Sequence, residues 1–285
     1  MMNFHPLDSG LARKSNLARK GIAYALQAPR TLDRLMSPSL RFAQQPPVIV
    51  NSIPKSGTHL MMQMARALPR TRYFGSFLAQ SPSTSLRLRK QGEIDFHIDR
   101  IVPGEVIGAH LHYSDATHAA LSRINALNIF IYRDPRDVVV SSLFYLRDAV
   151  SWNAISKAIR GMGSDEERLI AIINGVEAAG FPGLAERLAP YTGWKSADGV
   201  FAVSFEEART NPQAVASRLA DAYQARSPQT LDPDQRDRVM NAVSGGKSHT
   251  FRQGKVGNWV EHFTPPVQAA FDAQAGRLLE ELGYV

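Results

Sequence analysis

The fold is decided by residues 46–59, which form the stretch Pro46-Pro47-Val48-Ile49-Val50-Asn51-Ser52-Ile53-Pro54-Lys55-Ser56-Gly57-Thr58-His59. Residues 48–53 are short, rich in β-branched side chains and bounded by prolines, which predicts a buried strand. Residues 58–68 are rich in Leu and Met and stop before Pro69, which predicts a helix. A strand, a short turn and a helix in this order form a unit of an α/β fold.

The same signals recur along the rest of the chain. Further strands are predicted at residues 105–112, 128–132 and 200–205, and further helices at 135–147, 165–178, 184–188, from 212 onward and at 266–282. Residues 70–104 lack clear periodicity, so we expect a loop-rich stretch there. Strands that alternate with helices predict a three-layer α/β sandwich around a central parallel sheet. No repeat or linker divides the chain, so we expect a leader over residues 1–45 and one domain over residues 46–285.

The composition narrows the function classes. The 285 residues carry a formal net charge of +7 and contain no cysteine. Disulfides, thiolate catalysis and cysteine-bound zinc are therefore excluded. A chain without cysteine fits a reducing compartment, so we expect a cytoplasmic protein. Residues 1–45 hold seven basic and two acidic residues, a net charge of +5, which leaves the rest of the chain nearly neutral. No nucleic-acid partner is therefore expected.

The basic leader allows several interpretations. It is Arg-rich and acid-poor, as organelle transit peptides are. A basic helix that rests on a membrane surface or on the protein's own body fits the same pattern. So does a solvated or loosely docked arm. No run in the chain reaches the roughly 18 apolar residues that a membrane span needs.

The turn after the first predicted strand has the composition of an anion-binding loop. Backbone N–H groups at a helix N-terminus favour negative charge, and Gly57 lets the backbone approach an anion. Lys55 supplies a positive charge, and Ser56 and Thr58 supply hydroxyl donors. The alternative is an ordinary turn whose lysine faces solvent. The loop is not a Walker A motif, because Lys55 precedes the glycine.

Two later segments add cationic groups. Arg133 follows the strand at 128–132, at the end where ligands bind in open α/β sheets, and Ser141 lies two turns into the next helix. Both side chains suit a terminal phosphate. The alternative is a surface ion pair that caps the helix, either Arg133 with Asp137 or Arg136 with Asp134. Residues 251–259 form a basic segment with two glycines and a tryptophan, which is either a closing loop or a flexible surface turn.

Together these segments resemble the sulfotransferases that use 3′-phosphoadenosine 5′-phosphosulfate (PAPS) and release adenosine 3′,5′-bisphosphate (PAP). The family's loop for the 5′-phosphosulfate matches residues 54–58. Its segment for the 3′-phosphate matches at the same spacing, and its late segment matches in part. The matching residues of these two segments are Arg133, Pro135, Asp137 and Ser141, followed by Arg252, Gly254, Gly257 and Trp259. The order and spacing agree from about residue 47 to 265.

The resemblance implies a sulfotransferase fold, similar to that of P-loop NTPases, and transfer of a sulfuryl group to a hydroxyl or amine. The acceptor is a small molecule, a glycan or a lipid that the sequence does not name. His110, in the context Ala109-His110-Leu111, is the implied catalytic base, with His112 as a rival. Lys55 is the second implied catalytic residue, and no metal is required. The implied donor contacts are Lys55, Ser56, Gly57, Thr58, His59, Arg133, Ser141, Phe205, Arg252, Gln253 and Gly254.

The chain departs from the family at three positions that concern the donor. Leu60 stands where a tryptophan commonly stacks on adenine, Phe205 stands in place of a tyrosine, and Gln253 in place of a lysine. Because of these changes, the resemblance predicts the phosphate contacts better than the adenine contacts. A known dimer motif of the family matches only at Thr264, so that dimer is not expected.

Two other functions stay open at this point. A nucleoside-triphosphate-dependent kinase with a variant loop needs magnesium and an acidic ligand at the end of a core strand. The strand at 128–132 ends in Tyr132-Arg133, which disfavours that function. A non-catalytic module, in which the leader binds a membrane and the pocket senses a nucleotide, is the second alternative.

Overall fold

The computed structural model describes residues 5–10, 16–36, 41–81, 87–150, 152–242 and 255–285. Five strands in this part of the chain form one parallel sheet in the order β2-β3-β1-β4-β5. They are β1 (Val48–Ser52), β2 (Arg72–Ala79), β3 (Glu105–His110), β4 (Leu127–Tyr132) and β5 (Phe201–Ser204). The predicted α/β fold around a parallel sheet is confirmed.

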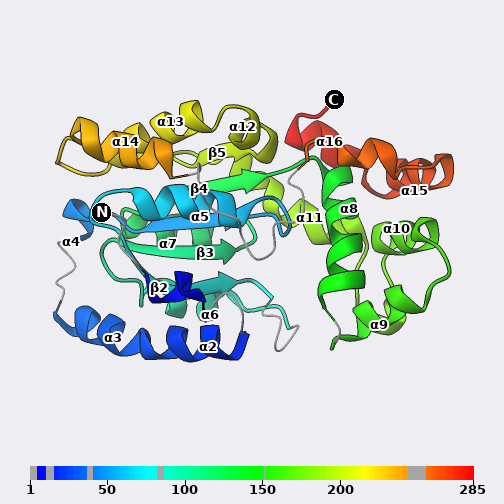
Figure 1. Ribbon diagram of the computed structural model, residues 1–285, viewed down its shortest axis with the longest axis horizontal. Coiled ribbons are helices and arrows are strands. Elements are labelled where there is room, and N and C mark those ends of the chain that lie inside the picture. The colour runs from blue at the N-terminus through cyan, green and yellow to red at the C-terminus, as the bar shows by residue number, and fades with distance from the viewer. Residues whose placement is uncertain (1–4, 11–15, 37–40, 82–86, 151, 243–254) are drawn as a thin grey trace.

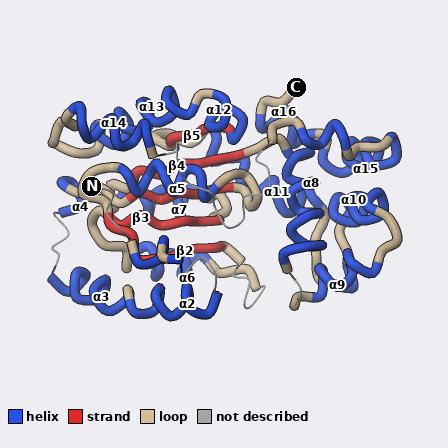
Figure 2. The backbone as a smooth tube through the Cα atoms, in the orientation of Figure 1, coloured by secondary structure: helices blue, strands red, loops and turns tan. Residues whose placement is uncertain are grey.

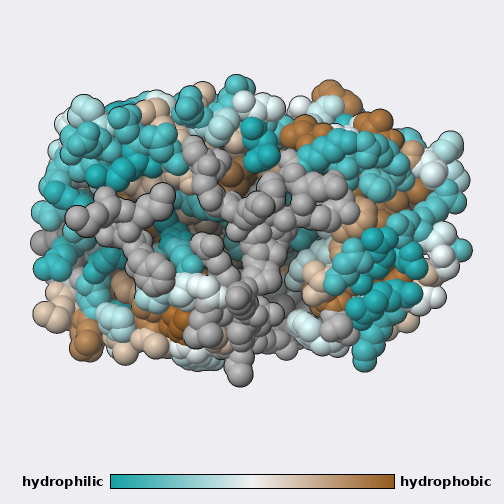
Figure 3. Space-filling model, in the orientation of Figure 1, coloured by the Kyte–Doolittle hydropathy of each residue, from teal (hydrophilic) through white to brown (hydrophobic). Residues whose placement is uncertain are grey.

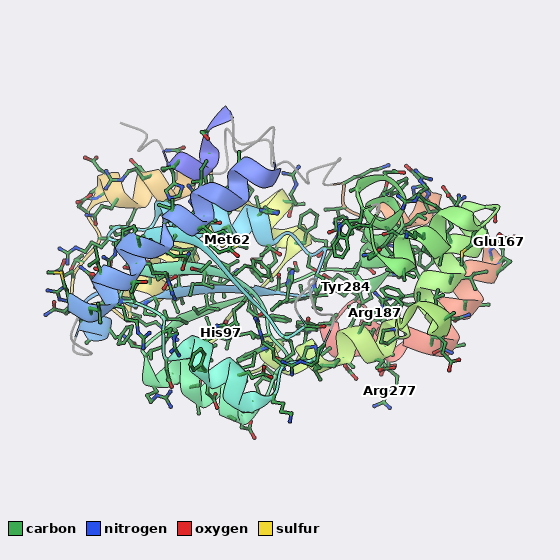
Figure 4. All side chains as sticks on the ribbon, turned by 90° about the horizontal axis from the view of Figure 1, so that it is seen from below. Met62, His97, Glu167, Arg187, Arg277 and Tyr284 are labelled. Atoms are coloured by element: carbon green, nitrogen blue, oxygen red, sulfur yellow. The ribbon has the colours of Figure 1, made fainter. Side chains whose placement is uncertain are left out.

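Helices cover both faces of the sheet (Figures 1 and 2). One face packs against α5 (Thr58–Ala67), α12 (Phe205–Thr210), α13 (Pro212–Gln224) and α14 (Pro233–Asn241), and the other against α6 (Gln91–Ile98) and α7 (Asp115–Arg123). Side chains alternate along each strand. In β1, Val48 and Val50 therefore enter the core beneath α5, whereas Ile49 enters the opposite core. In Figure 4, Met62 and His97 mark these two faces.

A helical lobe lies beyond the carboxyl ends of the strands, at the right of Figure 1. It contains α8 (Pro135–Phe144), a π-helical turn η2 (Tyr145–Ala149), α9 (Ala154–Gly161), α10 (Asp165–Asn174), α11 (Leu184–Thr192), α15 (Pro265–Ala275) and α16 (Arg277–Leu282). Figure 4 places Tyr284 where the lobe meets the sheet. There its hydroxyl donates to Glu206 at 2.6 Å. The lobe thus lies at the edge of the sheet where ligands bind in such folds.

Local sequence signals set the helix boundaries near the site. Asp134 caps α8 by accepting the Arg136 N–H at 2.9 Å, and Pro135 occupies the first helical position. At the other end of the chain, Gly283 ends α16 with a φ of 76°. The helices predicted from residues 58, 135 and 212 all begin at those residues.

Several sequence-based predictions of local structure were wrong. The stretch 70–104, which was expected to be loop-rich, contains the strand β2 and the helix α6, and neither was predicted. Its periodicity is obscured because the pairing of β2 shifts register between Tyr73 and Phe77, with Gly75 at a φ of 78° between them. The strand predicted to reach residue 112 ends at His110, and the helix predicted over 165–178 ends at Asn174. The predicted helix 135–147 turns into the π-helical segment η2 at Tyr145.

The leader rests on the protein's own body, which was one of its predicted interpretations. Its helices α2 (Asn16–Ala25) and α3 (Gln27–Met36) lie beside β2 at the edge of the sheet, and α4 (Arg41–Gln44) leads into β1. Arg30 forms an ion pair at 2.7 Å with Glu105, a fully buried carboxylate in β3. Among the described residues no helix has the length and apolar character to cross a membrane.

Candidate functional site

Parallel pairing brings the two cationic loops together. Ser52, the last residue of β1, lies in register with Ile131 of β4, and the Ile53 N–H donates to the Ile131 carbonyl at 3.3 Å. The chain segments that carry Lys55 and Arg133 therefore leave adjacent strands side by side. Burial and, to a smaller extent, the positive charge of Arg133 together lower the pKa of Lys55 to about 8. The two cations belong to one site.

The backbone of the first loop is shaped for close approach. Gly57 is the N-cap of α5 at a φ of 96°, and a Cβ there would lie 2.5 Å from the ring of Phe205, so only glycine fits. The first N–H groups of a helix, here those at the start of α5, point outward from its N-terminus and favour an anion. Ser56 is fully buried, and its Oγ has no hydrogen-bond partner among the described residues. An anion in the loop would satisfy the buried Ser56 hydroxyl.

Lys55 does not extend freely into solvent. Its backbone is in the left-handed region at a φ of 73°, and its Nζ lies 3.9 Å from the centre of the Tyr145 ring. This cation–π contact holds the ammonium at the start of η2. Ser141 is partly buried on α8, one helical turn before Tyr145, and its carbonyl accepts the Tyr145 N–H. Ser141 thus lies on α8 one turn before the residue that Lys55 contacts.

Arg133 is buried at the end of β4. One guanidinium nitrogen, Nη2, donates to Asp137 Oδ2 at 3.0 Å and to the Lys255 carbonyl at 2.8 Å, and the group stacks on Phe205 at 4.4 Å. Its Nε is buried without a partner among the described residues. The Arg133–Asp137 ion pair considered from the sequence does form, but it is buried. It leaves the N–H group at Arg133 Nε without a hydrogen-bond partner among the described residues.

The late basic segment is described only from Lys255 onward. The predicted contacts Arg252, Gln253 and Gly254 lie outside the described residues. Immediately after them, Gly257 and Trp259 donate their backbone N–H groups to the two oxygens of Asp137, at 3.0 Å and 2.9 Å. The buried carboxylate therefore joins this segment to Arg133.

His110 lies at the end of β3, next to the loop after β1. Its Nδ1 is 2.9 Å from the Ser52 carbonyl, and its ring meets the edge of Phe77 with centroids 4.9 Å apart. Burial lowers the pKa of His110 to about 4, and the positive charges of His59 and Lys55 act in the same direction. His110 is thus within electrostatic reach of the loop.

The rival His112 lies in a different environment. Its ring packs edge-on against Tyr191 of α11, with centroids 4.8 Å apart. Burial lowers its pKa, but no charged group of the loop contributes to that shift. The strand ends before His112, so the regular alternation that would place both histidines on one face does not apply. Of the two histidines, the structure brings His110 to the anion-binding loop.

Apolar side chains occupy two positions that the resemblance associates with adenine, and both are packed in this chain. Leu60, at the position of the family's stacking tryptophan, packs against the core beneath α5. Phe205 is only 5 % exposed, and its ring lies between Gly57 and Arg133. Phe205 therefore links the two cationic loops through packing.

Sequence reasoning missed four residues that the structure places at the site. Asn51 and Ser52 end β1, and Phe77 and Tyr145 flank His110 and Lys55. Asn51 and Ser52 carried a signal, because two polar residues interrupt an apolar strand just before the loop. The positions of Phe77 and Tyr145 depend on tertiary packing, and no local pattern indicates them.

Comparison with known proteins identifies the family. The sulfotransferase domain family matches residues 45–283. Curated protein sequences gave no match. Mouse sulfotransferase SULT7A1 complexed with PAP has a TM-score of 0.55 at 18 % identity, over 82 % of this chain and 84 % of that chain. A retinol dehydratase in complex with androsterone and inactive cofactor PAP has a TM-score of 0.51 at 15 % identity, over 85 % of each chain. These structures share the fold, and because the family match spans nearly the whole domain, the chain belongs to the sulfotransferase family.

Proposed function

We propose that this enzyme transfers the sulfuryl group of PAPS to a hydroxyl or amine of a small-molecule acceptor and releases PAP. The observation that carries the proposal is the convergence of Lys55, Arg133 and His110 at the carboxyl ends of three adjacent strands. Two buried donors without partners among the described residues, Ser56 Oγ and Arg133 Nε, support the fit of a ligand with phosphate groups.

The loop residues provide the contacts for the 5′ end of such a donor. Lys55, Ser56 and Thr58 supply a cation and two hydroxyls, and the backbone of residues 57–59 supplies N–H groups. Arg133 and Ser141, with Arg252, Gln253 and Gly254, are the proposed contacts for the 3′-phosphate and its surroundings. Binding at that remote end fixes the position of the reacting group.

His110 is the proposed general base. Its Nδ1 is bound to the Ser52 carbonyl, which leaves Nε2 to remove the proton from the acceptor hydroxyl. As the acceptor oxygen forms its bond to sulfur, the bond from sulfur to the phosphate oxygen breaks. Lys55 neutralises the charge that develops on that oxygen, together with the N–H groups at the start of α5. PAPS supplies the sulfuryl group and the phosphate leaving group, and positioning and electrostatics are the enzyme's contribution.

Aromatic side chains beside the reacting groups favour an acceptor with an apolar body. The ring of Phe77, 53 % exposed, contacts His110, and the ring of Tyr145, 39 % exposed, contacts Lys55. A structure of the same fold was solved with androsterone, which carries its reactive groups on an apolar skeleton. We therefore expect alcohols on an apolar or aromatic frame to be better acceptors than glycans.

The leader is the proposed site of peripheral membrane contact. Its outward surface exposes Tyr24, Leu32, Leu35 and Met36, each more than 60 % accessible, and Figure 3 shows apolar atoms along the edge formed by α3. The cytoplasm remains the proposed compartment, since a chain without cysteine has no disulfides to form.

Transfer of radioactive sulfur tests the proposed function. The protein is incubated with sulfur-labelled PAPS and a panel of apolar alcohols, and the labelled product is identified. His110→Ala should lower turnover by about 10²–10⁴, and Lys55→Ala by about 10²–10³. His112→Ala is the matched control, because it removes a neighbouring imidazole that does not contact the loop.

Three outcomes would contradict the proposal. Calorimetry that detects no PAP binding would remove the donor. Transfer of labelled phosphate from ATP with magnesium, without sulfuryl transfer, would favour a kinase. Wild-type rates in His110→Ala, with a loss in His112→Ala, would move the base to the second histidine.

A further inference from the structure

The end of β1 carries two polar side chains in an otherwise apolar strand. Asn51 and Ser52 are both fully buried. Burying a polar group is unfavourable unless it forms hydrogen bonds. The partners of these two side chains therefore indicate what the polar pair contributes. Apart from one bond within the pair and one to Thr58, those partners lie in residues 109–111, the segment that carries His110.

Asn51 fixes the backbone just after His110. Its Oδ1 accepts the Leu111 N–H at 2.8 Å, and its Nδ2 donates to the Leu111 carbonyl at 3.2 Å. The indole N–H of Trp194, which is fully buried, donates to the same carbonyl at 2.8 Å. The backbone at Leu111 is thereby held from two sides where the strand ends. These hydrogen bonds stabilise the backbone position of the residue that follows His110.

Ser52 determines how the His110 ring is oriented. The Ser52 carbonyl lies 2.9 Å from Nδ1 and the Ser52 hydroxyl 3.1 Å from the same nitrogen. A carbonyl only accepts, so Nδ1 carries the hydrogen and Nε2 carries the lone pair. This tautomer is the one that a base acting through Nε2 requires. When Nε2 gains a proton, the Nδ1–H bond to Ser52 stabilises the charged ring.

The Ser52 hydroxyl also contacts the anion-binding loop. Its Oγ lies 2.7 Å from Thr58 Oγ1 and 3.4 Å from the Ala109 carbonyl. A hydroxyl has one hydrogen to donate. When Thr58 donates its own hydrogen to a phosphate oxygen, it can only accept from Ser52. Ser52 then presents its lone pairs to the Nδ1–H of His110.

We propose that Ser52 is a positioning residue that couples occupancy of the donor loop to the orientation of His110. The inference rests on the proposed function, because it assigns the base to His110. With the loop filled, the hydrogen bonds run from His110 Nδ1 to Ser52, from Ser52 to Thr58 and from Thr58 to the donor. With the loop empty, Ser52 is free to donate to the Ala109 carbonyl instead. The base is thus best oriented when the donor is bound.

Kinetics of Ser52→Ala and Ser52→Thr test the coupling. Ser52→Ala should lower kcat by roughly 10-fold or more, as loss of a group that orients a functional histidine does, while PAP affinity changes little. Ser52→Thr keeps the hydroxyl and should recover most of the rate. The matched control is Ser156→Ala, which removes another fully buried hydroxyl, one with no partner among the described residues and outside the site. It should leave kcat unchanged.

Nitrogen-15 NMR of histidine adds a readout that does not depend on activity. In the wild type we expect His110 to carry its hydrogen on Nδ1, and PAP binding to shift the Nδ1 signal. In Ser52→Ala the PAP-induced shift should shrink. An Nε2–H tautomer in the wild type, or an equal PAP-induced shift in both proteins, would overturn the coupling. Equal kcat losses in Ser52→Ala and Ser52→Thr would overturn it as well.

Failure of the proposed function gives a different pattern. If wild-type protein binds PAP yet transfers no sulfuryl group, or if His110→Ala is fully active, the assignment of the base fails. The PAP-induced shift of the His110 Nδ1 signal can then still be compared between the wild type and Ser52→Ala. That comparison tests the chain of hydrogen bonds without any measurement of activity. If Ser52→Ala does not fold, the kcat of Ser52→Thr and the tautomer of His110 in the wild type can still contradict the inference.

Discussion

Lys55 and His110 have pKa values on opposite sides of neutral pH. Burial, assisted by the positive charge of Arg133, lowers the pKa of Lys55 to about 8. Burial lowers the pKa of His110 to about 4, against the opposing effect of its hydrogen bond to the Ser52 carbonyl. Between these values the imidazole is neutral and the ammonium is charged. These are the protonation states that a base and a phosphate-binding cation require.

The pH dependence of kcat/KM for the donor should therefore be bell-shaped. It rises as pH increases through about 4, where His110 loses its proton, and falls above about 8, where free Lys55 loses its charge. An anionic donor favours charged Lys55, so the alkaline fall in kcat should lie at higher pH than that in kcat/KM. The measurement uses an aliphatic alcohol, which does not titrate in this range.

Lys55→Arg is the control for the alkaline side of this profile. Guanidinium stays protonated throughout the range, so the fall near pH 8 should disappear even if the overall rate is low. Circular dichroism at each pH separates loss of activity from unfolding. Wild-type kcat/KM that stays constant to about pH 10 would contradict the role given to Lys55.

Residues of the site were predictable where a charged residue closely follows a predicted strand. Lys55 and Arg133 lie within three residues of the ends of core strands, so their location followed from the rule that ligands bind at strand ends. Ser52 was missed because a hydroxyl before a loop has no distinctive chemistry until its partners are known. Tyr145 was missed because its contact with Lys55 depends on the π-helical turn, which no residue pattern announces.

At the scale of elements, prediction succeeded where capping or apolar runs are strong. The turn and helix starting at Asp134-Pro135 and the run at 128–132 are examples. It failed for β2, because edge strands are half exposed and this one contains Gly75 at a positive φ. The helices α7, α9 and α14 were also missing from the sequence-based prediction, since their amphipathic faces are short.

The N-terminal turn of α8 holds the late segment through one carboxylate. Asp137 is fully buried and binds Arg133 and the N–H groups of Gly257 and Trp259. Removing one partner of a buried ion pair leaves the other charge uncompensated. The position of Arg133, which is a proposed contact for the 3′-phosphate, therefore depends on Asp137.

Asp137→Asn should destabilise the fold and weaken PAP binding together. We expect the free energy of unfolding in urea to fall by about 3 kcal/mol, because Arg133 loses a buried counter-charge. The control Asp221→Asn breaks an exposed pair with Arg236 and should change stability by less than about 1 kcal/mol. Equal stability losses in the two variants, or unchanged PAP affinity in Asp137→Asn, would show that Asp137 does not hold this segment.

At the scale of the whole molecule, the leader is attached to the sheet edge through its few inward-facing polar groups. Arg30 pairs with the buried Glu105, Asp33 with Arg72, and Asp8 with Arg66. Both acidic residues of the leader are thus bound to basic residues of the body. The charge of the leader was predictable, but its orientation was not, because a basic helix has the same sequence pattern whether it rests on protein or on lipid. Its outward surface combines apolar side chains with Arg34.

This surface should bind vesicles that contain anionic lipid. Tyr24 of α2 and Leu32 and Leu35 of α3 are exposed, with exposed fractions of 79 %, 61 % and 79 %. Apolar side chains next to basic residues are what an interfacial helix uses, and binding should weaken as salt rises. Co-sedimentation with phosphatidylcholine vesicles, with and without phosphatidylserine, measures the effect.

The double variant Leu32→Glu with Leu35→Glu should weaken vesicle binding by about tenfold or more, because it removes buried apolar area and adds negative charge at the lipid surface. Val285→Glu makes the same kind of change at an exposed apolar residue outside the leader and should leave binding intact. Sulfuryl transfer to a soluble acceptor should be normal in both, since the site lies at the strand ends. The alternative outcome is that the wild type does not bind anionic vesicles but forms a dimer, and that the double variant is monomeric. The surface would then bind a second copy of the chain, and the prediction of membrane contact would be wrong.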